Sequence, residues 1–415
     1  MPLSKRKDTY FIAAGEHSGD LLGAELALAL RERMPKVMPF GIVGEAMTRA
    51  RVEAVAHTSA LSVMGISEVL KKLAGLRMLE ARLLAWVDQL QPRFAVLIDN
   101  PGFNMRLGEQ LHLRGVPVYQ YVAPKVWAWG EGRVEQLRTN FDMVLGILPF
   151  EEEFFKARGV NYSYVGSPLK DRIDKVIIKR ASIGLPGHRP VIACLPGSRV
   201  SEIALNLPTL VGVQKLVAQA LPESLFVVPV SPNIDMETIA QVLRSTSGHI
   251  LTPRPLGTVF DLKVDAWEAA GLHFVRGMSL EIMAIADVAV VASGTATLEC
   301  ALIGTPLVVV YTTTELTYQI AKRVVKVPYA SLVNLMAGTP LVREFLQEFS
   351  YLDVANEVLS LLQDHARNQA MRLRFEEMRE QLKGMAAATA AELIVAAHPA
   401  LKGAASVPVS GAGGA

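Results

Sequence analysis

The chain has 415 residues, of which 51% are hydrophobic and 20% are charged, and its formal net charge is +2. This length exceeds one ordinary hydrophobic core and predicts two α/β domains, while the small net charge argues against a nucleic-acid partner. No apolar run is long enough to cross a bilayer, so we expect a cytoplasmic protein. The two cysteines, Cys194 and Cys300, lack metal-ligand spacing and are expected to be packed thiols.

Short apolar runs alternate with amphipathic helical patterns, which is typical of parallel α/β sheets. In the first half we predict strands at 10–14, 40–43, 94–98, 117–121, 143–147 and 162–165, with helices such as 20–33 and 76–90. In the second half we predict strands at 190–195, 225–230, 273–275, 287–292 and 306–311, with helices near 205–221 and 295–303. The polar stretch 166–189 separates the two sets.

The C-terminal part has a different pattern. Residues 344–396 have helical periodicity with no strand between them, and the tail 399–415 consists largely of Gly, Ala, Ser and Pro. We therefore predict domains at 1–170 and 171–345, C-terminal helices at 346–398, and a disordered tail at 399–415. Two Rossmann-like domains hold a ligand in a cleft between the C-terminal edges of their sheets.

A glycine-bearing turn, residues 15–20, follows the first predicted strand. It contains Glu16, Ser18 and Asp20, and the two carboxylates would be unusual in a phosphate-binding loop. A carboxylate in such a turn can bind a sugar hydroxyl. A plain turn with helix caps explains the pattern equally well.

Asp99 follows the apolar strand 94–98, and Asn104 lies five residues further on. A carboxylate between apolar walls can have its basicity raised enough to accept a proton. The alternative is an aspartate that caps the turn.

Two tryptophans, Trp127 and Trp129, lie beside a Pro-Lys turn after the fourth predicted strand, and Arg133 follows one helical turn later. The indole rings could line a site for a sugar or an acyl chain, or they could pack in the core.

Residues 61–78 form an apolar helical stripe edged by basic side chains. A core-facing helix explains this pattern, and so does an interfacial membrane helix. The apolar positions are Ile66, Val69, Leu70, Leu73 and Leu76, and the basic ones are Lys71, Lys72 and Arg77.

Two glycine segments, 195–199 and 293–297, each lie between an apolar strand and a helix. Glycine at such a turn lets backbone N–H groups face an anion, which the positive helix N-terminus also favours. Ser198, Arg199 and Ser293 add donors suited to phosphate. Residues 331–335 and Gln347 fall near the expected cleft, whereas Lys322, Arg323 and Lys326 are expected on a solvated face. No metal-ligand spacing, Walker lysine loop or catalytic triad is present.

Taken together, these segments resemble the lipid-A-disaccharide synthase family over residues 10–385, excluding about 250–270. One departure is Ser167, where the family usually has histidine, so any role of that histidine is in doubt here. The matching stretches are 15–20, 63–70, 98–104, 121–129 with Arg133 and Val134, 148–151, 195–199 with Glu202, 292–299, and 331–338 with 346–348.

The resemblance implies a GT-B glycosyltransferase of α/β class, with two Rossmann-like domains and C-terminal helices that cross back to the first. It implies an enzyme on the cytoplasmic face of the inner membrane that needs no cofactor or metal. The family joins UDP-2,3-diacylglucosamine to 2,3-diacylglucosamine 1-phosphate in a β(1→6) linkage, with inversion and release of UDP. In some members the C-terminal helices are exchanged between subunits, so a homodimer is an open expectation.

The resemblance also implies roles for individual residues. Asp99 is expected to be the base for the acceptor 6-hydroxyl, and Glu16 to contact a sugar. For the donor we expect Ser198, Arg199, Ser293, Gly294 and Thr295 at the diphosphate, Glu299 at the ribose, backbone near Met278 at the uracil, and Asn334 and Gln347 as further contacts. For the acceptor we expect Ser18, Asn104, Trp127, Trp129 and Arg133, and for the membrane Ile66, Val69, Leu70, Leu73 and Leu76.

Two alternatives remain at this point. One is another GT-B enzyme that uses a UDP-amino sugar, such as a lipid-linked peptidoglycan transferase or a UDP-N-acetylglucosamine 2-epimerase. The segment 15–20, Asp99, and the segment with Trp127 and Trp129 argue against it. The other is a non-catalytic lipid-binding protein that kept the fold. The joint presence of Asp99, Arg199 and Glu299 argues against lost activity.

Overall fold

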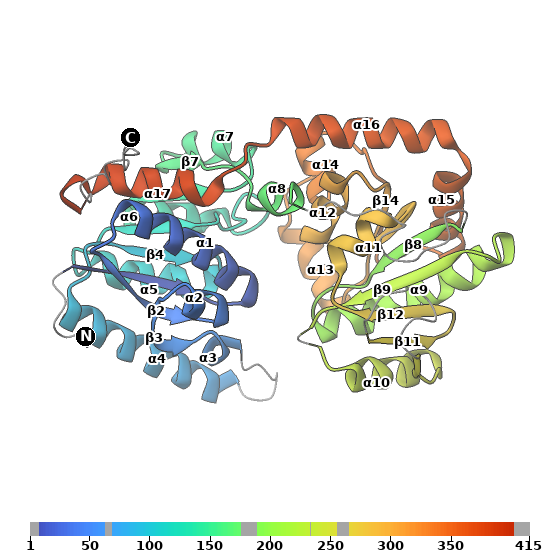
Figure 1. Cartoon of the computed structure of the whole chain (residues 1–415), viewed down its shortest axis with the longest axis horizontal. Coiled ribbons are helices and arrows are strands. Elements are labelled where there is room, and N and C mark those ends of the chain that lie inside the picture. The colour runs from blue at the N-terminus through green and yellow to red at the C-terminus, as the bar shows by residue number, and fades with distance from the viewer. Residues whose placement is uncertain (1–7, 63–68, 176–188, 233, 255–264, 402–415) are drawn as a thin grey trace, which may run out of the picture. The chain divides into compact units, whose positions relative to one another are not determined.

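A computed structural model describes residues 8–62, 69–175, 189–232, 234–254 and 265–401 (Figure 1). The chain divides into two compact units. Unit 1 holds Met1–Pro168 and Lys383–Ala415, and unit 2 holds Leu169–Leu382. The backbone N–H of Ser167 donates to the carbonyl oxygen of Lys383 at 2.8 Å, so the points where the chain leaves and re-enters unit 1 are held together.

Within its described residues, unit 1 contains a seven-stranded sheet in the order β3-β2-β1-β4-β5-β6-β7, with every pairing parallel. The order reverses between β1 and β4, which therefore flank the topological switch point of this sheet. The strands are β1 (Thr9–Ala14), β2 (Met38–Val43), β3 (Glu53–His57), β4 (Ala95–Ile98), β5 (Val118–Tyr121), β6 (Met143–Gly146) and β7 (Tyr162–Tyr164).

Helices cover both faces of this sheet. They are α1 (His17–Arg33), α2 (Glu45–Arg49), α3 (Ser59–Ser62), α4 (Val69–Leu90), α5 (Pro101–His112), the 3-10 turn η3 (Glu131–Arg133), α6 (Val134–Asn140), α7 (Glu151–Lys156), α17 (Ala386–Ala397) and η5 (Pro399–Leu401). The helix α8 (Pro168–Ile173) begins at the boundary between the units.

The two faces of the unit 1 sheet are set by the alternation of side chains along β1. Tyr10 and Ile12 join a core cluster with α1 and α17, whereas Phe11 and Ala13 join a second cluster with α4 and α5. The apolar side of α17 packs against α1, and the two helices lie side by side in Figure 1. Unit 1 thus takes its last helix from the far end of the chain.

Unit 2 contains an eight-stranded sheet among its described residues, in the order β10-β11-β12-β9-β8-β13-β14-β15. Its order reverses at the adjacent strands β8 and β13. The strands are β8 (Val191–Leu195), β9 (Leu225–Val230), β10 (Thr252–Arg254), β11 (Ala266–Ala269), β12 (Leu272–Arg276), β13 (Val288–Ala292), β14 (Leu307–Tyr311) and β15 (Glu344–Leu346).

The helices of unit 2 follow its strands. Helices α9 and α15 pack together, and α12 contacts α11, α14 and α16. The helices are α9 (Val200–Ala220), α10 (Met236–Ser247), α11 (Ser279–Ile285), α12 (Thr295–Ile303), α13 (Glu315–Val324), α14 (Leu332–Ala337), α15 (Tyr351–Gln363) and α16 (His365–Gln381).

The structure departs from the predicted elements in several places. Strand β3 and the antiparallel strands β10 and β11 were not predicted, and β15 lies inside the region 344–396 that was expected to be free of strands. Residues 399–401 form η5 rather than part of a disordered tail, and 402–415 lie outside the described residues. Helices α15 and α16 belong to unit 2, and α17 to unit 1. Among the described residues, no helix has the length and apolar character of a membrane span.

Candidate functional site

Unit 1 carries candidate site residues at the switch point of its sheet. Ala14 at the end of β1 is in register with Ile98 at the end of β4, so the turns that follow these strands adjoin. An added Cβ on Gly15 would lie 2.1 Å from the Asn100 side-chain nitrogen, and only glycine fits this contact. The structure therefore brings the turns that hold Gly15 and Asp99 together, although these residues are 84 positions apart in sequence.

Asp99 has unusual backbone geometry. Its φ is +49°, that of Asn100 is +44°, and that of Val122 after the neighbouring strand β5 is +69°. Left-handed backbone costs a residue with a side chain about 1–2 kcal/mol, and a β-branched residue such as Val122 adopts it rarely. Such strain persists only where the surroundings fix it, and it is common at functional sites.

Two buried amides fix this backbone. The Gln120 side chain donates to the carbonyl oxygens of Asp99 and Val122, at 3.2 and 3.1 Å. The Asn104 side chain donates to the carbonyl oxygens of Ile98 and Asp99, at 3.1 and 2.6 Å. Asn104, expected to contact the acceptor, is buried and uses its amide to hold the Asp99 turn.

The 15–20 turn divides into an exposed and a buried part. Glu16 and Ser18 are exposed at the start of α1, where Glu16 is the N-cap. Asp20 is buried, and its carboxylate accepts hydrogen bonds from the backbone N–H groups of Gly44, Ala46 and Met47. Asp20 therefore fixes the start of α2, while Glu16 and Ser18 lie at the surface beside Asp99.

Trp127 is held by a buried carboxylate. Its indole N–H donates to Glu151 at 2.9 Å, and the Tyr162 hydroxyl donates to the other oxygen of Glu151 at 3.0 Å. Burial raises the pKa of Glu151 to about 7, although both hydrogen bonds act in the opposite direction. Trp127 is half-buried and also packs against the unit 1 core, so its ring is fixed.

Trp129 is exposed and forms a cation–π pair with the half-buried Arg133. The Arg133 guanidinium lies 4.3 Å from the centre of the Trp129 ring, and the indole is 47% exposed. This cation–π contact places a positive charge over a flat apolar surface. Such a surface suits a sugar ring that bears an anionic substituent.

Unit 2 carries a separate group of candidate site residues at the switch point of its own sheet. Leu195 in β8 is in register with Val291 in β13, so the segments 196–199 and 293–295 follow adjacent strands. These are the two glycine segments predicted to bind phosphate. The first leads into α9 and the second into α12, and each supplies backbone N–H groups at a helix start.

In the first segment the backbone donors already have an acceptor. One oxygen of the Glu202 carboxylate accepts from the N–H groups of Ser198 and Arg199 at 3.0 and 3.2 Å, and the other accepts from the Arg199 guanidinium at 2.9 Å. Gly197 has φ +121°, and an added Cβ there would lie 2.6 Å from Glu202. Any anion that bound at these amides would compete with Glu202 for the same donors.

The second segment is tied to a loop further along the chain. The Ser293 hydroxyl donates to the carbonyl oxygen of Ala330 at 2.9 Å. The Glu344 carboxylate accepts from the N–H groups of Ala330 and Ser331 at 2.8 and 2.9 Å. It also accepts from the Asn334 side chain at 2.8 Å. Gly294 and Thr295 follow Ser293 at the start of α12, where Thr295 is exposed.

Asn334 and Gln347 are expected to contact the UDP-sugar. In the structure, the side chains of both residues form hydrogen bonds with backbone groups of unit 2. Asn334 is buried, and its side chain pairs with both polar backbone groups of Val342. The Gln347 side chain pairs in the same way with Thr313, at 3.0 and 3.1 Å. In the structure, each of these side chains holds a loop in place. Contact of either side chain with a ligand stays a prediction.

Glu299 lies on α12 and pairs with Arg172 of α8, with 3.3 Å between the guanidinium and the carboxylate. Burial raises the pKa of Glu299, and Arg172 opposes that shift. Met278, expected near the uracil, follows β12 at the same C-terminal edge of the sheet and has φ +59°.

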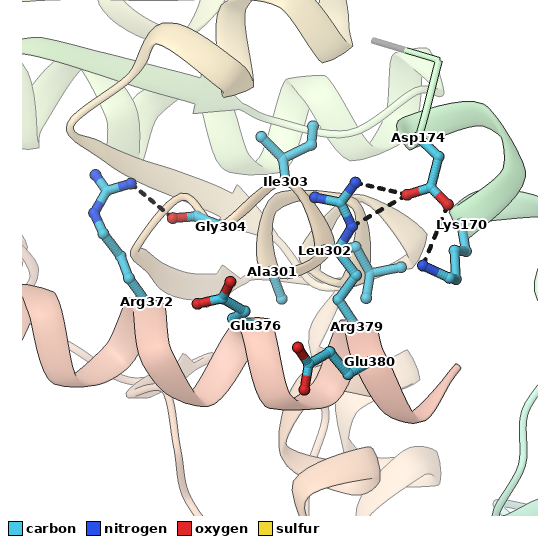
Figure 2. A pocket seen from close by; sticks show the side chains of 10 residues that line it. All are labelled: Lys170, Asp174, Ala301, Leu302, Ile303, Gly304, Arg372, Glu376, Arg379 and Glu380. Carbon is cyan, nitrogen blue, oxygen red and sulfur yellow. Dashed lines mark hydrogen bonds and ion pairs between the residues drawn. The ribbon is translucent and has the colours of Figure 1, made fainter. Parts of the chain in front are cut away.

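A pocket of about 460 Å³ lies in unit 2, between the C-terminal end of α12 and the helix α16 (Figure 2). Several of its charged side chains have partners: Arg379 and Lys170 contact Asp174 at 2.6 and 3.2 Å, and Arg372 donates to the carbonyl oxygen of Gly304. Because α12 is about 13 Å long, this pocket lies one helix length from the segment 293–295. It contains none of the predicted site residues.

The predicted membrane stripe lies partly outside the described residues. Ile66 lies outside the described residues, and Val69, Leu70 and Leu73 are described only as backbone of α4. Leu76 is half-buried and packs against the unit 1 core. In the part of the chain that the structure describes, no group of three His, Cys, Asp or Glu side chains could hold a metal ion.

Several residues that shape the site were not predicted as site residues. They are the buried polar side chains Gln120, Glu151 and Asn206, together with Glu344 and Arg172. Asn206 donates to the carbonyl oxygen of Pro196 and accepts from the N–H of Thr312, at 3.3 and 3.0 Å, so it joins the first glycine segment to the end of β14. A polar residue at a core-facing position was the one signal in the sequence that could have identified them.

Solved structures with this fold include several nucleotide-sugar enzymes. A structure described as the glycotransferase of kitacinnamycin matches with a TM-score of 0.60 and 18% identity, over 94% of this chain and 99% of that one. The UDP-GlcNAc 2-epimerase of Neisseria meningitidis matches with a TM-score of 0.55 and 12% identity, over 94% and 99%. These likenesses show a GT-B fold and do not separate transferases from epimerases.

Sequence comparison distinguishes between these two classes of enzyme. The family model for lipid-A-disaccharide synthetase matches residues 10–253 and 256–397. A lipid-A-disaccharide synthase of Myxococcus xanthus is 38% identical over 393 residues, which cover 94% of this chain and 97% of that protein. The chain therefore belongs to the lipid-A-disaccharide synthetase family of GT-B glycosyltransferases.

Proposed function

We propose that this chain transfers 2,3-diacylglucosamine from UDP-2,3-diacylglucosamine to the 6-hydroxyl of 2,3-diacylglucosamine 1-phosphate. The observation that carries the proposal is the position of the site residues in a chain of this family. Asp99 and Glu16 follow the two strands at the switch point of unit 1, and the two glycine segments follow those of unit 2. Open α/β sheets bind their ligands at these points.

In the proposed reaction, the acceptor 6-hydroxyl oxygen attacks the anomeric carbon and the Asp99 carboxylate takes the hydroxyl proton. The bond from the anomeric carbon to the diphosphate breaks, and UDP leaves with the electron pair. Displacement from the opposite face inverts an α-linked donor into a β-linked product. The strained turn held by Gln120 and Asn104 supports this role, because it fixes the Asp99 backbone beside the 15–20 turn.

On the donor side, we assign the diphosphate to the start of α12 at Ser293, Gly294 and Thr295, and to Ser198 and Arg199 of the first segment. Backbone N–H groups and the Arg199 guanidinium stabilise the charge that develops on the leaving UDP. We assign Glu299 to the ribose and the backbone near Met278 to the uracil. Asn334 and Gln347 support these loops through their backbone pairing.

On the acceptor side, we assign Glu16, Ser18, Trp127, Trp129 and Arg133 to the sugar and its substituents. Trp127 is fixed by Glu151, and the paired Trp129 and Arg133 offer an apolar plane with a positive charge. Both substrates carry acyl chains and belong to a membrane surface. We therefore propose that unit 1 contacts the cytoplasmic face of the inner membrane through the stripe that begins at Ile66, and that two copies of the chain form a homodimer.

The proposal is tested by incubating the purified full chain with both lipid monosaccharides in mixed detergent micelles and measuring UDP and disaccharide. UDP release that requires the acceptor, with disaccharide formed in equal amount, supports the transferase. Conversion of UDP-N-acetylglucosamine to its 2-epimer without acceptor would support an epimerase instead. Binding of the lipids without any turnover would support a non-catalytic lipid-binding protein.

A further inference from the structure

Helix α13 of unit 2 (Glu315–Val324) turns its apolar side chains outward. Leu316, Ile320 and Val324 recur at every fourth position and therefore share one helix face. They are 73%, 51% and 44% exposed, and Val325 directly after the helix is 42% exposed. No residue of α13 is buried.

The opposite face of the helix rests on the protein. Tyr318 and Ala321 are the half-buried positions of α13, and they lie on the side away from Leu316 and Ile320. A helix on the surface of a water-soluble domain normally presents its apolar stripe to the core and its polar side to solvent. In α13 the stripe of Leu316, Ile320 and Val324 lies on the outward side instead.

Positive charge gathers at the C-terminal end of the same helix. Lys322 and Arg323 lie in its last turn and Lys326 follows two residues after it, and all three are exposed. Glu315, at the other end, is the acidic residue of the helix, and it accepts a hydrogen bond from Gln319. An outward apolar stripe next to basic side chains is the combination that binds an anionic lipid surface.

The loop before α13 is fixed next to the residues of unit 2 that we assign to the UDP-sugar. Thr312 donates to Asn206, and Thr313 pairs with Gln347, so the helix starts from the C-terminal edge of β14. Strand β14 pairs with β13, whose end leads to Ser293. Adjacent strands are about 4.8 Å apart, so the chain that enters α13 starts one strand away from the second glycine segment.

We propose that α13 is a membrane-binding helix of unit 2 that inserts Leu316, Ile320 and Val324 into the surface of an anionic bilayer. This inference rests on the proposed function, in which the donor substrate carries acyl chains. It adds a second contact, on the donor side, to the stripe assigned to unit 1. A donor held between the glycine segments and α13 would keep its acyl chains at the lipid surface while its nucleotide reached the protein.

The test compares two double variants of the full chain in sedimentation with vesicles of phosphatidylcholine and phosphatidylglycerol. We expect Leu316→Ser with Ile320→Ser to weaken partitioning about tenfold, and the similarly exposed control pair Leu113→Ser with Ile250→Ser to change it little. Lys322→Gln with Arg323→Gln should weaken binding to anionic vesicles by about fivefold or more, and binding to pure phosphatidylcholine much less. Unchanged partitioning of the Leu316 and Ile320 double variant would overturn the proposal.

A second measurement reports insertion directly. Ile320→Cys carrying an environment-sensitive fluorophore should shift its emission to the blue on anionic vesicles, whereas Ile250→Cys should not. The natural thiols Cys194 and Cys300 are buried and do not compete for label in the folded protein. If the protein is bound to vesicles and the emission of the Ile320→Cys label stays at the wavelength seen in water, the proposal is also overturned.

Two further outcomes are distinguished. If the Leu316 and Ile320 double variant shifts the protein from dimer to monomer and keeps its vesicle binding, α13 is an interface between two copies and the proposal is wrong. Turnover in detergent micelles is measured in parallel. Absence of turnover in the unaltered chain would contradict the proposed function. Vesicle binding and insertion of the label test α13 independently of turnover.

Discussion

Gln120 and Asp99 are joined by a hydrogen bond between neighbouring strand ends, in which the Gln120 side-chain nitrogen donates to the Asp99 carbonyl oxygen at 3.2 Å. The same nitrogen donates to Val122 at 3.1 Å. Gln120 thus holds two left-handed residues, one of them the proposed base, and acts as a positioning residue that does not itself touch substrate.

Replacing Gln120 with leucine is expected to reduce kcat by tenfold or more, with little change in the KM for the UDP-sugar. Two buried carbonyl groups lose a donor, which also lowers the free energy of unfolding by about 1–3 kcal/mol. Steady-state kinetics and thermal unfolding measure the two effects. Gln136→Leu, an exposed position on α6, is the matched control. A stability loss with unchanged kcat would make Gln120 merely structural.

Replacing Asp99 with asparagine is expected to lower turnover by about 10²–10⁴-fold, because a positioned general base contributes about that factor. The substitution keeps the size of the side chain and its tolerance of left-handed backbone. UDP binding, measured by calorimetry, should stay close to that of the unaltered chain. Asp88→Asn, an exposed position on α4 that pairs with Arg114, controls for loss of a carboxylate elsewhere. Near-normal turnover of Asp99→Asn would remove Asp99 from the role of base.

Glu202 and Arg199 are expected to affect UDP binding in opposite directions. Arg199→Ala should weaken binding about tenfold or more, because a charge-assisted hydrogen bond contributes about 1.5–3 kcal/mol. Glu202→Gln keeps an acceptor for the two backbone N–H groups and removes a negative charge from beside them, so UDP should bind more tightly. Calorimetric titration measures both. Weaker binding by Glu202→Gln would mean that the ion pair is needed to orient Arg199.

Glu151 is expected to make stability depend on pH. Burial raises its pKa from 4.5 to about 7, so between these values the native protein retains a proton that the unfolded chain has released. The stabilisation is therefore complete below pH 4.5 and is lost as the pH rises through 7, by up to about 3 kcal/mol. Denaturant unfolding at pH 4.5 to 8 measures it.

The matched variant for this prediction is Glu151→Gln, which keeps an acceptor for Trp127 and cannot ionise. Its free energy of unfolding should fall less across this pH range than that of the unaltered chain. Parallel pH profiles of the two proteins would contradict the raised pKa of Glu151.

The strands at the centre of both sheets could be predicted because their apolar runs are continuous and end at glycine or polar turns. Strands β3, β10, β11 and β15 lie towards the sheet edges and are short or mixed in composition, so local pattern did not identify them. Their pairing depends on neighbours that are distant in sequence.

The candidate site likewise combines features that the local sequence predicts with features that depend on residues distant in sequence. The turns that carry Glu16, Asp99, Arg199 and Ser293 could be found from the sequence, because a glycine or aspartate after an apolar strand is a local signal. Which turns adjoin was decided by strand order, which places β1 beside β4 and β8 beside β13.

The sequence by itself determined the family, the two α/β units and the position of the turns that carry polar side chains. Only the tertiary structure decided which polar side chains serve the protein's own backbone. Asn104, Asn334 and Gln347 were expected at ligands, yet each bonds to neighbouring backbone, whereas Gln120 was overlooked inside a strand. The physical reason is that a buried amide nitrogen donates to whatever acceptor lies within about 3 Å of it, and that neighbourhood exists only once the chain has folded.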